Sequence, residues 1–98
     1  MHANVTSGEI QSDKMDEFIK IYNESVKPIV EKIPGLQNLY VLTDSVNSKA
    51  MIIAHYGSQI EAENASADGH VQAAMGKLVS TLVLESIVRG SYEVSIMI

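Results

Sequence analysis

An apolar stripe along residues 15–33 is the feature that most restricts the fold of this chain. Its members recur at steps of three and four, as on one face of an α-helix. They are Met15, Phe18, Ile19, Tyr22, Val26, Ile29, Val30 and Ile33. Ser12-Asp13 supplies an N-cap signal, and Pro34-Gly35 is a stop signal. Pro28 lies inside the stripe, so we expect the helix to bend or restart near residues 24–27.

Four further segments have the pattern of β-strands. Residues 5–11 form the first, and residues 36–43 and 50–56 form a hairpin around the turn-forming residues 44–48. Residues 87–98 alternate between apolar and polar side chains, which predicts a strand that runs to residue 98.

Two helices are expected between the hairpin and the last strand. Ser58 is a candidate cap for a short helix over residues 59–65, and Asp68-Gly69 interrupts the chain again. A second long helix is predicted after Gly69 from an apolar stripe. That stripe consists of Val71, Ala74, Met75, Leu78, Val79 and Leu82.

The order strand, helix, strand, strand, helix, strand predicts an α+β, ferredoxin-like βαββαβ fold with a four-stranded antiparallel sheet. Both long helices would cover one face, and in a monomer the other face would be polar. Residues 50–56 do not fit a polar face. Met51, Ile53 and His55 alternate there with Ile52, Ala54 and Tyr56. An apolar face of this extent marks an interface, so we expect a homodimer.

The length of the chain limits the number of domains, and its net charge limits the kinds of partner. The 98 residues suit one domain, 1–98, and a net charge of -5 argues against nucleic acid and anionic membranes as partners. The sequence has no cysteine, no apolar leader at its start and no stretch of membrane-spanning length. We therefore expect a cytoplasmic protein.

The order of several short landmarks resembles that of antibiotic-biosynthesis-monooxygenase-like domains. They are Lys14-Met15-Asp16-Glu17-Phe18, the Pro28 region, Pro34-Gly35-Leu36, the hairpin, Tyr56-Gly57-Ser58 and Gly69-His70-Val71. The resemblance covers nearly the whole chain. It implies a dimeric α+β barrel, in which the sheets of two protomers pack face to face and a ligand pocket lies between each sheet and its helices.

The chain departs from that family at several polar positions. Tyr56 takes the place of an aromatic residue and His70 keeps one of two histidines, but Ala65 replaces the other. Ile52 stands where the quinone-forming monooxygenases have asparagine. Met75 stands where the haem-degrading members have their haem-ligating histidine, so the resemblance disfavours haem degradation.

His70 and Tyr56 are the candidate catalytic residues. A neutral His70 can act as a general base toward a phenol-like or enolisable substrate, and the alternative is a structural role at a helix start. Tyr56 can orient a substrate oxygen or simply fill an apolar cavity. Because neighbouring strand residues point to opposite faces, His55 should face the partner protomer if Tyr56 faces the pocket. Which face of strand 36–43 lines that pocket stays open at this point.

No metal or cofactor is expected, because the histidines are far apart in sequence and no glycine-rich phosphate loop occurs. The first hypothesis is a cofactor-independent monooxygenase, or a related proton-transfer enzyme, acting on a small, mostly apolar substrate such as a quinol. The second is a non-catalytic small-ligand-binding or assembly module. The third, suggested by the resemblance of Val46-Asn47-Ser48 and Tyr56 to one family member, is an isomerase of a phosphorylated sugar-like signal molecule.

Overall fold

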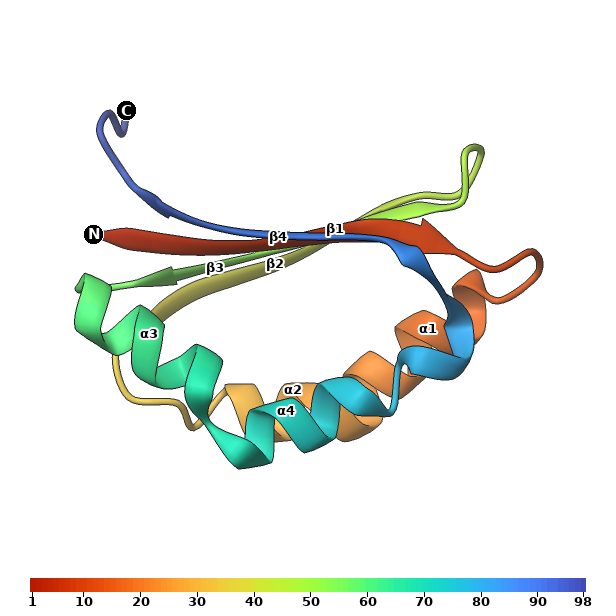
Figure 1. Ribbon diagram of the computed structural model, residues 1–98, viewed down its shortest axis with the longest axis horizontal. Helices are drawn as coiled ribbons and strands as arrows, with labels where there is room; N and C mark the ends of the chain where they lie inside the picture. The colour runs from red at the N-terminus through yellow and green to blue at the C-terminus, as the bar shows by residue number, and fades with distance from the viewer.

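A four-stranded antiparallel sheet carries all of the helices on one face (Figure 1). The computed structural model describes residues 1–98. Its strands are β1 (His2–Ile10), β2 (Leu36–Asp44), β3 (Lys49–Tyr56) and β4 (Leu82–Glu93), in the order β2-β3-β1-β4. This architecture confirms the predicted α+β, ferredoxin-like fold.

The first helical region follows the predicted stripe and contains the expected irregularity. It consists of α1 (Met15–Ile21), a π-helical turn (Tyr22–Val26) and α2 (Lys27–Val30). Pro28 has no N–H to donate to the preceding turn, and the wider π turn ends two residues before it, at Val26. The Ser12-Asp13 cap does not form: Lys14 is the N-cap residue and makes no side-chain capping bond, and Asp13 has a φ of 64°.

The second helical region starts as predicted. In α3 (Gln59–Ala67), the Ser58 hydroxyl accepts a hydrogen bond from the backbone N–H of Glu61 over 3.2 Å. In α4 (Gly69–Gly76), the Asp68 carboxylate caps the first turn by accepting from the backbone N–H of His70 and of the next residue.

The end of this region differs from the prediction. Helix α4 stops at Gly76, a 3-10 turn covers Val79–Thr81, and β4 begins at Leu82. Leu82, assigned to the helical stripe, is a strand residue paired with Ile10. The error has a simple cause: residues four apart, such as Leu78 and Leu82, share a face in a strand as well as in a helix.

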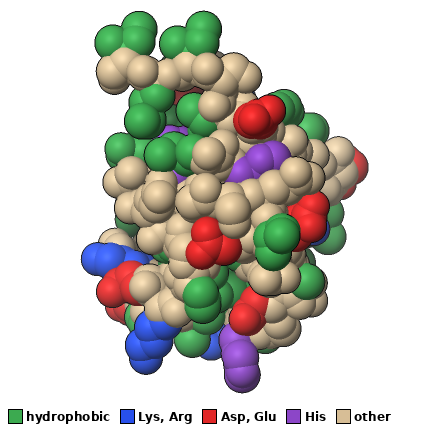
Figure 2. Space-filling view, turned by 90° about the vertical axis from the view of Figure 1, so that its left-hand side faces the viewer, with side chains coloured by type: hydrophobic (Ala, Val, Ile, Leu, Met, Phe, Trp, Pro, Cys, Tyr) green, Lys and Arg blue, Asp and Glu red, His purple; other side chains and the backbone are tan.

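The last strand therefore begins five residues earlier than predicted and ends at Glu93, not at residue 98. Residues 94–98 lie outside the sheet, although the Val94 N–H still donates to the Met1 carbonyl over 3.0 Å. Ile96, Met97 and Ile98 are highly exposed there. In Figure 2, hydrophobic side chains gather at the top of the view, where the C-terminal end rises above the sheet.

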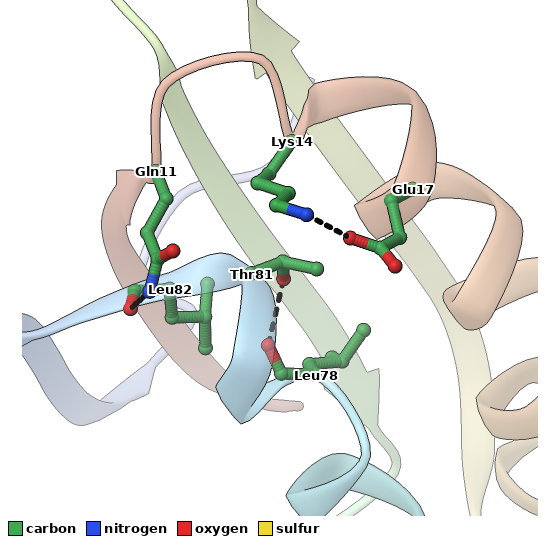
Figure 3. A network of polar contacts seen from close by, with 6 residues as sticks. All are labelled: Gln11, Lys14, Glu17, Leu78, Thr81 and Leu82. Atoms are coloured by element: carbon green, nitrogen blue, oxygen red, sulfur yellow. Dashed lines mark hydrogen bonds and ion pairs between the residues drawn. The ribbon is translucent and has the colours of Figure 1, made fainter.

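Polar contacts join the β1–α1 turn to the start of β4 (Figure 3). The Gln11 backbone N–H donates to the Thr81 carbonyl over 2.8 Å, and the Gln11 side-chain amide donates to the Leu82 carbonyl over 3.0 Å. Thr81 is fully buried, and its hydroxyl donates to the Leu78 carbonyl over 2.6 Å. These bonds fix the 3-10 turn, and they explain why the chain leaves its helical path before β4.

Two apolar clusters hold the helices on the sheet. The larger consists of Ile10, Phe18, Tyr22, Val26, Val30, Ala74 and Leu78. The smaller lies under α3 and consists of Ala54, Tyr56, Ala62 and Ala65. No helix is long and apolar enough to cross a membrane.

The sheet surface opposite the helices is uncovered and largely apolar, and we call it the open face. It includes Tyr40, Leu42, Met51, Ile53, His55, Val88 and Tyr92. Val88 is 64% exposed and Tyr92 is 59% exposed. The rings of Tyr40 and His55 meet edge to face there, with centroids 6.2 Å apart. The pairing of Tyr40 with Ile53 places Asn38, Tyr40 and Leu42 on the open face, and Leu39 on the helix side.

Candidate functional site

A cavity of about 450 Å³ lies between the sheet and the helices, mainly beneath α4. Fourteen of its 22 lining residues are hydrophobic, among them Ile52, Ala54 and Met75. All four strands contribute to the sheet side, β2 only through Leu39, and the helix side comes largely from α3 and α4. Its size and apolar lining suit a small, mostly apolar molecule.

Tyr56, the last residue of β3, lines this cavity. Only 7% of the residue is exposed, and it packs with Ala54, Ala62 and Ala65. Burial raises the pKa of its phenol above the ordinary value of 10.0, so the group is protonated at neutral pH. Tyr56 can therefore donate a hydrogen bond to a ligand oxygen but is a poor base.

His70, the second residue of α4, is exposed and does not line the cavity, whereas its neighbour Val71 does. The structure does not bring the side chains of His70 and Tyr56 together within this site. His55 lies on the open face, paired with Ala3, as expected for a residue that faces away from Tyr56. No group of three or more His, Cys, Asp or Glu side chains is placed to hold a metal ion.

A polar network at one end of the cavity was not foreseen from the sequence. The Asn4 side-chain amide donates to the Ala62 carbonyl and to Ser66 Oγ, both over 3.0 Å. The Ser91 hydroxyl donates to Asn4 Oδ1 over 3.1 Å, and His2 Nε2 lies 2.7 Å from Ser91 Oγ. These groups satisfy one another across β1, β4 and α3, so the network positions the elements around the cavity.

Arg89 is the only charged residue that lines the cavity. It lies on β4 opposite Thr6 of β1, and Thr6 also lines the cavity. Arg89 was not identified as a site residue from the sequence. One signal was present: Arg89 lies between Val88 and Gly90 in the predicted strand, so its side chain points away from the apolar face that carries Val88.

Solved structures share this arrangement over almost the whole chain. A mutant of SnoaB, a cofactor-independent oxygenase from Streptomyces nogalater, matches with a TM-score of 0.79 and 12% identity, covering 98% of this chain and 94% of that one. An antibiotic biosynthesis monooxygenase matches with a TM-score of 0.76 and 12% identity, covering 96% and 98%. This chain has the antibiotic-biosynthesis-monooxygenase-like fold.

The same fold is found beyond proteins of that name. An uncharacterised NIPSNAP domain protein from Burkholderia xenovorans matches with a TM-score of 0.67 and 19% identity, covering 97% of this chain and 95% of that one. No protein-family model and no curated protein matches the sequence. At these identities, the likeness establishes the monooxygenase-like fold and not the reaction.

Within this monooxygenase-like fold, three departures from the family pattern meet in one place. Ile52, Ala65 and Met75 all line the cavity. Each stands where the resemblance implied a polar side chain in one or another branch of the family. The departures therefore make this cavity more apolar and leave Tyr56 and Arg89 among its few polar side chains.

One further phenol lies near the site. Tyr22, in the π-helical turn, is 6% exposed, and its hydroxyl is the only buried side-chain polar atom without a hydrogen-bond partner. Burial, and next the nearby Tyr56, raise the pKa of Tyr22 to about 12. Tyr22 packs against Phe18, with ring centroids 6.4 Å apart, and forms part of the main core.

Proposed function

We propose that the cavity binds a small, mostly apolar molecule and that the chain acts as a cofactor-independent monooxygenase or a related proton-transfer enzyme. The observation that carries the proposal is the cavity of about 450 Å³ beneath α4, with Tyr56 in its lining. The monooxygenase-like fold supports it, because the SnoaB mutant that shares this fold is described as a cofactor-independent oxygenase.

In this proposal, Tyr56 orients the substrate by donating a hydrogen bond to a quinol or ketone oxygen. The cavity lining supplies no evident general base to remove a proton from the substrate, because it contains no His, Asp or Glu. His70 would act as the base only on a substrate group that projects from the cavity past Val71. Otherwise, the substrate must enter already ionised, as a phenolate.

The test is oxygen uptake by the purified protein with a panel of quinols and anthrones. We expect turnover of at least one compound, and Tyr56→Phe should slow it about tenfold because one hydrogen bond to the substrate is lost. If His70→Ala turns over every substrate as fast as wild type, His70 is not the base. If no compound consumes oxygen faster than in buffer, the monooxygenase proposal fails.

A non-catalytic ligand-binding module is the second candidate. The apolar character of Ile52, Ala65 and Met75 favours it, since these positions supply no group for chemistry. A ligand that binds only the folded state raises the melting temperature. Stabilisation by an anthrone without any oxygen uptake would therefore support this function over the enzyme.

We also propose that two copies of the chain pair through the open face. The face carries Tyr40, Leu42, Met51 and Val88 in contact with solvent, and no helix covers it (Figure 1). Burial of such a surface against a second copy is favourable at roughly 25 cal/mol per Å² of apolar area. The cavity lies on the opposite side of the sheet, so pairing would leave it within each protomer.

A further inference from the structure

Arg89 is held on the cavity side of the sheet by the strand register. It pairs with Thr6 across β1 and β4, and residues directly opposite in an antiparallel pair share a face. Ile87, two positions earlier, also lines the cavity, as the alternation of strand residues requires. Arg89 therefore lies at the rim of the cavity, where it is exposed to solvent, and not on the open face.

The positive charge of Arg89 has no partner within the protein. Lys14 and Glu17 form the only salt bridge, and the Arg89 side chain makes no hydrogen bond. Glu93 projects from the same face of β4 but does not pair with it. In contrast, the polar groups of Asn4 and Ser91 on that face are bonded to one another. Arg89 thus differs from Asn4 and Ser91 in having its donors free for water or a ligand.

The chemistry of the guanidinium group narrows the class of ligand. It carries a permanent positive charge and presents its N–H donors in a planar fork that matches a carboxylate. Because Arg89 is solvent-exposed at the rim of the cavity, its pair with a carboxylate is partly screened by water. The chain has a net charge of -5, so an anion would be attracted by this one local group and not by the protein as a whole.

The register also sets the separation between Arg89 and Tyr56. Tyr56 pairs with His2 and Arg89 pairs with Thr6, so the two lie four residues apart along β1. That step corresponds to about 13 Å along the strand. Over this distance, the cavity wall includes the apolar side chains of Ile52 and Ala54.

We propose that the ligand of this cavity is an elongated apolar carboxylate, whose carboxylate pairs with Arg89 while its body lies along β3 toward Tyr56. This inference rests on the proposed binding function and adds the ligand's charge and its orientation. It predicts that the cavity distinguishes an anion from a neutral molecule of the same shape.

The experiment compares anthracene-2-carboxylate with anthracene-2-carboxamide, which has nearly the same shape but no charge. Binding of both is measured by fluorescence titration at low salt with wild type, Arg89→Gln, Arg89→Lys and the control Lys77→Gln. Lys77 is exposed and does not line the cavity, so its replacement makes the same change in net charge elsewhere. Melting temperatures establish that all variants are folded.

We expect wild type to bind the carboxylate about three- to fivefold more tightly than the amide at low salt, since an ion pair with a solvent-exposed arginine is worth roughly that factor. Arg89→Gln should lose this preference while retaining its affinity for the amide, and Lys77→Gln should keep both. Arg89→Lys should retain part of the preference, because lysine keeps the charge but not the fork.

Equal affinities of wild type for the two compounds would overturn the inference, as would a preference that survives in Arg89→Gln. In either case the proposed binding function would stand, because the amide still binds. If neither compound binds, the carboxylate proposal is overturned. If quinols and anthrones also fail to bind, the proposed function falls with it.

Discussion

Asn4 on β1 donates a hydrogen bond to Ser66 Oγ on α3 over 3.0 Å, which ties the first strand to a helix 62 residues later in the sequence. The same amide group bonds to the Ala62 carbonyl, and Ser91 donates to the Asn4 oxygen. We expect Asn4→Ala to lower the free energy of unfolding by roughly 1–3 kcal/mol, because it leaves these partners without their bonds. Urea denaturation measures the change.

The matched control is Asn64→Ala. Asn64 is an exposed residue of α3 and makes no side-chain hydrogen bond, so its replacement should change the stability by less than about 0.5 kcal/mol. Equal effects of the two substitutions would show that the Asn4 network does not hold α3 on the sheet.

Tyr22→Phe should stabilise the protein, because it removes a buried hydroxyl that has no partner. The expected gain is about 1 kcal/mol, or a rise in melting temperature of roughly 4–8 °C. Tyr22→Ala, which also removes the ring from the core, should destabilise by about 3 kcal/mol. A melting temperature that falls in Tyr22→Phe would mean that the hydroxyl is bonded in solution.

The stability advantage of Tyr22→Phe over wild type should widen at alkaline pH. The pKa of Tyr22 is about 12 in the folded state against 10.0 as its ordinary value. Between these values, the folded protein binds more protons than the unfolded chain, so the stability of wild type falls as the pH rises. This contribution is fully present below pH 10, and the variant has no phenolic proton to lose at this position. Urea denaturation of both proteins at pH 8 and at pH 11 measures the difference, and an unchanged difference would contradict the raised pKa.

Ile53→Asp should dissociate the proposed dimer, because it places a charge near the centre of the open face, between Val5 and Tyr40. Sedimentation of wild type should give a dimer and that of the variant a monomer. The control is Ile60→Asp on α3, where Ile60 is 68% exposed and lies away from the open face. A dimer that persists in Ile53→Asp would show that the contact uses another surface.

Most of the fold could be predicted from the sequence because its signals are local. Each of these signals determines structure within a few residues of itself. Examples are the apolar stripe around Phe18 and Val26, Pro28 after the π turn, and the helix caps Ser58 and Asp68. The α4–β4 boundary was misplaced because the Leu78–Leu82 spacing fits both a helix and a strand. The bond between the Gln11 N–H and the Thr81 carbonyl, which helps to fix this boundary, comes from the turn after β1 and is distant in sequence.

Much less of the candidate site could be predicted. Tyr56 lines the cavity, and its role there stays a prediction. Whether a given side chain lines the cavity depends on strand register, which the local sequence does not reveal. The pairing of Arg89 with Thr6 joins residues at opposite ends of the chain. Similarly, the resemblance pointed to His70, yet the helix start presents Val71 to the cavity instead.

The central claim is that the cavity beneath α4 holds a ligand, and a cavity-filling substitution tests it most directly. Met75 is half-buried and lines the cavity, whereas Ala73 is exposed on the same helix and does not. Anthrone binding by wild type, Met75→Trp and Ala73→Trp should be compared by titration calorimetry. We predict that Met75→Trp weakens binding more than about tenfold, because the larger side chain occupies the ligand's space, while Ala73→Trp binds like wild type. Binding by Met75→Trp that equals that of wild type would contradict the claim.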